Sequence, residues 1–356
     1  MTPSNSHAKH LLLTIALVVA FASSASPFAQ AGKADKRLDI YWVDVEGGAA
    51  TLIVTPAGES ILIDTGNPGV RDATRIFKVA TEIARLREIN HLIVTHYHRD
   101  HFGGAATLAG ALPIRHVHDN GIFETIRERP SKEYLQFAAD KRSVINPGDQ
   151  IKLKNVDDKD VARVALRCLT TRQKFPAAGD APKNTAACAS APSRPEDMSD
   201  NANSVVTLIS FGPFRFFDAG DLTWNLEKKL VCPVNRVGKV DVYQVTHHGL
   251  GSSNNPVIVK TLAPTVAIMN NGVTKGCNPE VFATLKRTKS FQAIYQMHKN
   301  LRKDRENNVP DEYIANIERE CNANYIKLSV DPTGKTYTVT IPANGHTRTY
   351  KTKLSR

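Results

Sequence analysis

Hydrophobic and polar positions alternate over short stretches in the first third of the chain, a pattern typical of half-buried strands. It predicts strands over residues 38–44, 50–55 and 60–64, and the turn chemistry of residues 56–59 joins the last two into a hairpin. An amphipathic helix then follows, because apolar residues repeat at helical spacing at Ile76, Val79, Ala80, Ile83 and Leu86.

Strand and helix patterns alternate along the rest of the chain. Helices are predicted over residues 103–112, 131–142 and 223–230, and a terminal hairpin over 325–330 and 336–341. Early hairpins followed by strand–helix units predict an α/β fold with two sheets flanked by helices, in one domain. Further strands are predicted over residues 91–95, 114–118, 150–153, 161–169, 204–211, 214–218 and 240–246.

Residues 170–202 differ from the rest because they are rich in Ala, Pro, Asp and Ser and have no periodicity. Such a segment cannot supply a core of its own. We expect it to be mobile or to lie over the edge of the active site.

Residues 1–31 have the three parts of a secretory signal peptide. Lys9 precedes the apolar run of residues 11–21, and small residues lead to the sequence Ala29-Gln30-Ala31. The run is short for a membrane anchor, which is the alternative. We therefore expect cleavage after Ala31, a periplasmic or secreted mature protein of residues 32–356, and no membrane anchor after cleavage.

Composition and charge exclude a disordered protein and indicate what kind of substrate the protein binds. With 41% hydrophobic and 23% charged residues, the sequence is that of a globular protein and not of a disordered one. Its formal net charge of +11 favours a small-molecule or polyanionic ester substrate, and nucleic acid is one candidate polyanion. A solvated basic surface without a specific partner is the alternative.

The cysteine count is odd, so at least one thiol stays free even if export places the chain in an oxidising compartment. No C-x-x-C pair is present, which argues against a zinc ribbon or a thioredoxin-like site. We expect the disulfides Cys168–Cys188 and Cys277–Cys321, with Cys232 buried and free.

Three histidines and an aspartate follow the predicted strand of residues 91–95. His96, His98, Asp100 and His101 form the pattern H-x-H-x-D-H. Imidazole nitrogen and carboxylate oxygen are ligands of zinc and similar metals. Histidines at i and i+2 can face one ion, and the next two side chains can turn toward a second. The pattern predicts a two-metal site, with a hydrogen-bonded polar loop as the alternative.

Two further groups follow predicted strands downstream. Asp221 ends the turn Ala219-Gly220-Asp221, and His247 and His248 follow the strand of residues 240–246. Taken alone, an aspartate after glycine is common in turns, and a histidine pair is usually on the surface. Their order after the first motif favours additional metal ligands.

With these residues, the chain resembles the metallo-β-lactamase fold superfamily over about residues 38–300. Within it, the chain is most similar to the hydrolase domain of bacterial competence proteins that handle incoming DNA. The resemblance implies an αββα four-layer sandwich with the metals at one edge. The predicted terminal hairpin lies beyond the region of resemblance, as a C-terminal β-hairpin extension. Besides the histidine motif it rests on Asp44, Asp64-Thr65-Gly66, Asn203-Ser204, Ala219-Gly220-Asp221 and His247-His248-Gly249.

The resemblance also implies two divalent ions, zinc with manganese or iron as alternatives. It places His96 and His98 on one ion, Asp100 and His101 on the other, and Asp221 between the two. The preferred last ligand is His247, with His248 as the next choice.

Two positions complete the implied site. Asp64 would orient a ligand or a loop, as carboxylates next to metal-binding histidines commonly do. No histidine occurs between His118 and His247, so the position of the family's middle histidine ligand is empty or filled by Asn203.

The implied reaction is hydrolysis by a metal-bound hydroxide. Asp100 belongs to the catalytic centre, and His298 is a candidate proton donor or substrate contact, with a purely structural histidine as the alternative. Phosphodiesters and other phosphate esters are the leading substrates. Opening of a lactam or lactone ring at the same site is one alternative, and a metal-binding protein without catalysis is another.

Overall fold

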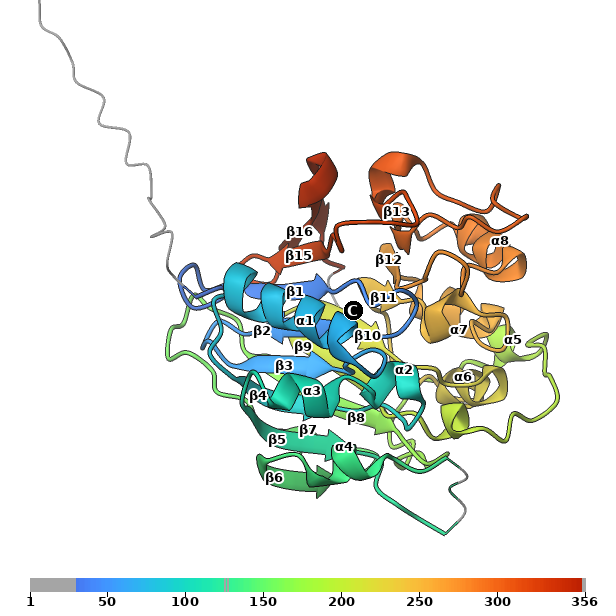
Figure 1. Cartoon of the computed structure of the whole chain (residues 1–356). Coiled ribbons are helices and arrows are strands. Elements are labelled where there is room, and N and C mark those ends of the chain that lie inside the picture. The colour runs from blue at the N-terminus through green and yellow to red at the C-terminus, as the bar shows by residue number, and fades with distance from the viewer. Residues whose placement is uncertain (1–29, 125, 127, 354–356) are drawn as a thin grey trace, which may run out of the picture.

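The computed structural model describes residues 30–124, 126 and 128–353, so most of the predicted signal peptide lies outside the described residues. Two β-sheets pack face to face, with helices on both outer faces (Figure 1). Apolar side chains form three layers, one between the sheets and one beneath the helices of each outer face. This arrangement is the α/β fold with an αββα sandwich that the sequence predicts.

The first sheet has nine strands in the described part of the chain. Its β2–β3 hairpin pairs Thr51 with Ile63, as the turn at residues 56–59 predicts. The strands across this sheet are β17 (His346–Lys351), β16 (Thr336–Ile341), β15 (Ile326–Val330), β1 (Leu38–Trp42), β2 (Thr51–Val54), β3 (Ser60–Ile63), β4 (Ile89–Ile93), β5 (Ile114–Asp119) and β6 (Ala139–Val144).

The second sheet has eight strands among the described residues, and its central strands are parallel. Parallel strands bring their carboxyl ends to one edge, where the loops that follow can meet. The strands across this sheet are β14 (Ile314–Asn316), β13 (Ala293–His298), β12 (Val266–Met269), β11 (Val242–Gln244), β10 (Phe214–Asp218), β9 (Val206–Phe211), β8 (Val164–Thr170) and β7 (Gln150–Ile151).

Short helices cover both sheets. None of the helices among the described residues is both long and apolar enough to cross a membrane. The first sheet carries α1 (Val70–Lys78), its π-helical continuation η1 (Val79–Ile83), α2 (Arg99–Phe102), α3 (Ala105–Ala109) and α4 (Lys132–Gln136). The second carries α5 (Thr185–Cys188), α6 (Trp224–Val231), α7 (Pro256–Leu262) and α8 (Pro279–Arg287). Single 3₁₀ turns are η2 (Asp200–Asn203), η3 (Thr246–Gly249), η4 (Asp311–Tyr313) and η5 (Pro342–Asn344).

Two predicted elements differ from the structure. The helix expected over residues 131–142 ends after α4, and the chain then becomes the edge strand β6, where Lys141 pairs with His116 of β5. Pairing with a distant strand outweighs local helical periodicity here. The C-terminal hairpin is followed by a third strand, β17, and pairs with β1, so it completes the first sheet instead of extending from it.

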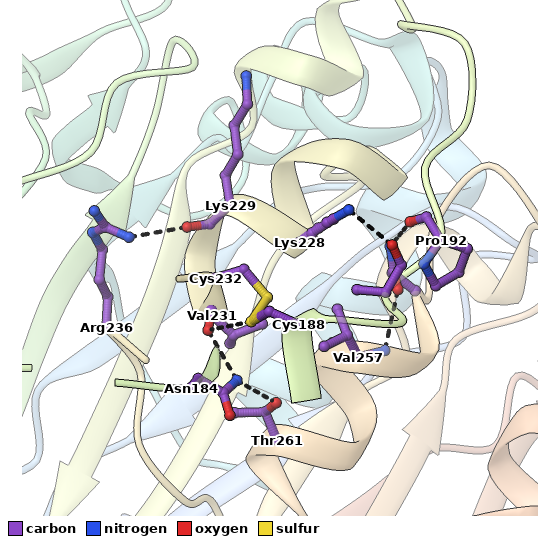
Figure 2. Close-up of a disulfide and its surroundings, with 12 residues drawn as sticks. Asn184, Cys188, Pro192, Lys228, Lys229, Val231, Cys232, Arg236, Val257 and Thr261 are labelled. Carbon is purple, nitrogen blue, oxygen red and sulfur yellow. Dashed lines mark hydrogen bonds between the residues drawn. A yellow bond between two sulfur atoms is a disulfide. The ribbon is translucent and has the colours of Figure 1, made fainter. Parts of the chain in front are cut away.

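Residues 170–202 are attached to the helices of the second sheet (Figure 2). Lys228 of α6 donates from Nζ to the Ala191 carbonyl at 2.8 Å, and Asn255 Nδ2 donates to the Pro192 carbonyl at 3.0 Å. The guanidinium of Arg194 stacks 3.8 Å from the Trp224 ring centroid. These contacts attach to the second sheet's helices a segment that the sequence predicts to be mobile or to lie over the edge of the active site.

The disulfide joins Cys188 of α5 to Cys232 at the end of α6 (Figure 2). The expected pairs Cys168–Cys188 and Cys277–Cys321 are therefore wrong. Cys168 lies in the layer between the sheets and Cys277 in the layer beneath the helices, so each is buried away from its expected partner.

Replacing both members of this bridge in Cys188→Ser/Cys232→Ser should lower the free energy of unfolding by about 2–4 kcal/mol, because the bridge closes a long loop in the unfolded chain. Chemical denaturation and limited proteolysis of residues 170–202 would measure the loss. Cys321→Ser, which alters a half-buried free thiol, is the control. Equal stability of the double variant and the control would contradict the assigned bridge.

Candidate metal centre

The predicted histidine motif lies where the chain leaves β4 and enters α2. His96 and His101 are fully buried, whereas the side chain of His98 is 28% exposed. Asp221 follows β10 in the other sheet and is also buried. The motif and Asp221 therefore meet at the edge where carboxyl ends of both sheets converge.

The first group of ligand-type side chains consists of His96, His98 and Asp221, whose donor atoms lie within 4.8 Å of one another. His96 Nε2 is 3.0 Å from His98 Nδ1 and 3.9 Å from Asp221 Oδ2. Burial lowers the pKa of His96 well below its ordinary value, so the ring is neutral, as metal binding requires.

The second group consists of Asp100, His101, Asp221 and His248, again with donor atoms within 4.8 Å of one another. His101 Nε2 lies 3.1 Å and His248 Nε2 3.4 Å from Asp221 Oδ2. Asp100 Oδ2 is 3.3 Å from His248 Nε2 and 3.6 Å from His101 Nε2. Asp221 thus belongs to both groups, in the bridging position that the resemblance implies.

The histidine pair contributes mainly through His248. His247 Nε2 does reach within 3.2 Å of Asp221, but its Nδ1 faces the hydroxyls of Ser252 and Ser253, and it falls outside both groups. Both histidines have positive φ, +56° and +54°, which turns the chain sharply after β11. The geometry thus favours His248, although the sequence favours His247.

Asp64 has the orienting position expected of it. Its Oδ2 lies 2.7 Å from His101 Nδ1, and it also accepts hydrogen bonds from the backbone and the hydroxyl of Thr95 at 2.8 and 2.7 Å. Burial by itself would lower the pKa of His101, but Asp221, Asp64 and Asp100 raise it well above its ordinary value. The negative charges of these three carboxylates, which favour a proton on the ring, attract a metal cation in the same way.

The turn before Asp221 requires glycine. Gly220 has φ +52°, and a Cβ there would lie 2.9 Å from Thr95 Cβ. The turn thus brings Asp221 close to the loop that carries the histidine motif. Ser204, for which the sequence predicts no role of its own, supports the same contact, since its Oγ is 3.3 Å from the Asp221 amide and 3.4 Å from His96 Nδ1.

Asn203 lies beside the site but not in either group. Its Nδ2 donates to Asp200 Oδ1 at 2.9 Å, and Asp200 Oδ2 accepts from the Tyr97 amide at 2.7 Å. Asn203 therefore acts through Asp200 on the loop between His96 and His98. No local sequence pattern marks Asp200 for this contact, because its partner Tyr97 is 103 residues away in the chain.

His298 is surrounded as a purely structural histidine would be, which is the alternative to a role as proton donor or substrate contact. Its Nε2 lies 2.6 Å from Asp44 Oδ1, and both side chains are fully buried. Arg75 pairs with the other oxygen of Asp44 at 3.0 Å. Burial would raise the pKa of Asp44, but His298 and Arg75 lower it below its ordinary value. A substrate contact or proton donor would need access that this ring lacks.

Several buried polar atoms indicate that a metal fits the site. His101 Nε2 and both ring nitrogens of His248 are buried and have no hydrogen-bond partner among the described residues. Unpartnered polar atoms are costly inside a protein, and the two Nε2 atoms lie 3.1 and 3.4 Å from Asp221 Oδ2. Nitrogen and carboxylate donors in this number suit zinc and related divalent ions.

A lysine in the loop after β12 lies next to the second group of ligand-type side chains, and the sequence did not predict it. Lys275 Nζ contacts Asp100 Oδ2, and its side chain is 38% exposed. His101, His248 and Lys275 lower the pKa of Asp100 although its burial would raise it. No sequence motif marks Lys275, which reaches the site only because the loop after β12 packs there.

Comparison with known proteins agrees with this geometry. Residues 43–172 match the model of the metallo-beta-lactamase superfamily. Recombination protein 2 of Haemophilus influenzae is 25% identical over 246 residues, which are 69% of this chain and 25% of that protein. A UPF0173 metal-dependent hydrolase of Cupriavidus metallidurans is 35% identical over 86 residues, 23% of this chain and 26% of that protein. The chain thus spans about a quarter of the length of these relatives.

Among solved structures, a metal-dependent hydrolase from Parabacteroides distasonis aligns with 72% of this chain and 93% of its own, at 12% identity and a TM-score of 0.40. The family match includes Asp64 and the whole histidine motif, while Asp221 and His248 lie beyond it. Residues 43–172 of the chain are therefore similar to the metallo-beta-lactamase superfamily.

Proposed function

We propose that this protein is a metal-dependent hydrolase of phosphate esters, with phosphodiesters foremost. The observation that carries the proposal is the pair of ligand groups that share Asp221. When bound, two divalent ions lower the pKa of a water molecule and stabilise the negative charge that develops on the attacked ester.

The chain's own residues prepare this chemistry. Asp221 is buried, yet its histidine neighbours lower its pKa well below the ordinary value, so it stays a carboxylate. Asp64 holds the His101 ring by Nδ1, which leaves Nε2 directed at Asp221. A fixed ring orientation lets the ligands bind without reorganisation.

Lys275 supports an anionic substrate. Its partly exposed ammonium lies at Asp100, on the accessible side of the second group. Asp100 would release this ammonium on holding a cation at the same oxygen, and Lys275 would then be free to contact a substrate anion. Lysine binds phosphate as a compact charge, and the net charge of +11 acts in the same direction at long range.

Export to the periplasm or the medium is part of the proposal. The bridge Cys188–Cys232 supports it, because disulfides persist in oxidising compartments and are rare in the cytosol. Cell fractionation should find the protein outside the cytoplasm with this bridge oxidised. A reduced, cytoplasmic protein would contradict this part.

Removal of either the shared ligand Asp221 or the first-group ligand His96 should abolish nearly all activity. His96→Ala and Asp221→Ala should each lower hydrolysis of bis-p-nitrophenyl phosphate more than about 100-fold and reduce the metal content, and the double variant should be little worse, because the ligands act as a unit. Elemental analysis and circular dichroism would separate loss of metal from loss of fold.

His346→Ala, outside both groups, is the control for these variants. A screen with plasmid DNA, nitrocefin and lactones, after reconstitution with zinc or manganese, would identify the substrate class. Turnover of lactams or lactones alone would contradict the phosphate-ester assignment. An inert protein with two bound ions would contradict catalysis altogether.

Lys275→Ala should raise KM for a phosphodiester about tenfold with unchanged metal content, which corresponds to ~1.4 kcal/mol of lost binding. Lys275→Arg should keep most of the affinity. Lys299→Ala, which removes a lysine of similar exposure paired with Asp311, is the matched control. The same KM in both alanine variants would show that Lys275 does not contact the substrate.

A further inference from the structure

Three histidines lie together on the first sheet, away from the candidate metal centre. His91 is on β4 and His116 lies opposite it on β5, with His118 two residues farther along. Ile93, two residues from His91, packs between the sheets, whereas Val117 packs beneath the helices. All three imidazoles therefore lie on the inner side of the sheet.

The three rings converge closely. One donor nitrogen from each lies within 4.8 Å of the other two, and His91 Nδ1 is 3.2 Å from His118 Nε2. The His116 and His118 ring centroids are 3.8 Å apart. Two imidazole nitrogens on one tetrahedral zinc ion, with Zn–N bonds of about 2.0–2.1 Å, lie roughly 3.3 Å apart. The closest pair already has that separation.

Polar groups lie beside two of these rings. The carboxylate of Glu59 is 3.9 Å from the remote nitrogen of His91, and the Ser143 hydroxyl is 2.9 Å from His116 Nε2. His118 is buried and the other two histidines are half-buried, so the cluster is largely shielded from solvent.

We propose that His91, His116 and His118 form a second, separate binding site for a divalent transition ion of the zinc class. Such an ion would have three protein ligands and a free position, and would crosslink β4 to β5. None of these three histidines belongs to either ligand group of the candidate metal centre, so the two sites share no ligand. The crosslinked strand leads directly into the loop of the candidate metal centre.

Zinc binding by the full chain carrying Asp221→Ala tests this site independently of the proposed hydrolase. Equilibrium dialysis should show one zinc ion fewer per chain once His91→Ala and His116→Ala are added to this variant. His346→Ala in the same background keeps the ion and serves as the control. Equal zinc content with and without the two histidines would overturn the proposal and leave a hydrogen-bonded cluster.

A second measurement keeps the test valid if the combined variant does not fold. In the Asp221→Ala protein, zinc should protect His91 and His116 from diethyl pyrocarbonate at least fivefold, as read by peptide mass spectrometry. His346, which lies outside the cluster, should react equally with and without zinc. Unchanged modification of His91 and His116 at saturating zinc would overturn the proposal.

Discussion

The carboxylate of Asp221 is surrounded by imidazoles that come from both sheets. Its Oδ2 lies 3.1 Å from His101 and 3.9 Å from His96, which follow β4, and 3.4 Å from His248, which follows β11. A buried carboxylate among nitrogen donors is stable only with protons or cations between them. The site therefore depends on how the two sheets are positioned relative to each other, because each sheet supplies part of the cluster.

Contacts between the sheets maintain that register. Trp42 of β1 donates from Nε1 to the side-chain oxygen of Gln244 on β11 at 2.7 Å, and Thr51 of β2 donates to the same oxygen at 3.0 Å. Gln244 lies only a few residues before His247 and His248. These buried hydrogen bonds, set in a large apolar layer, tie the first sheet to the strand that delivers the histidine pair.

Much of this could be predicted from the sequence because the signals are local. The hairpin at residues 56–59 is set by its turn, and the H-x-H-x-D-H motif follows one strand, so the superfamily and the αββα layers were predictable. The predictions that were wrong concern elements whose structure depends on residues far away in the sequence. Strand β6 forms only against β5, and Cys188 meets Cys232 across 44 residues of sequence.

The central claim is that Asp221 lies between two ions, each held by its own group of side chains. Anomalous diffraction from crystals of the zinc-loaded protein, collected at the zinc edge, tests it most directly. The account predicts two peaks about 3.5–4 Å apart on either side of the Asp221 carboxylate, one beside His96 and His98 and the other beside His101 and His248. A zinc-saturated crystal with no peak within bonding distance of Asp221 would contradict it.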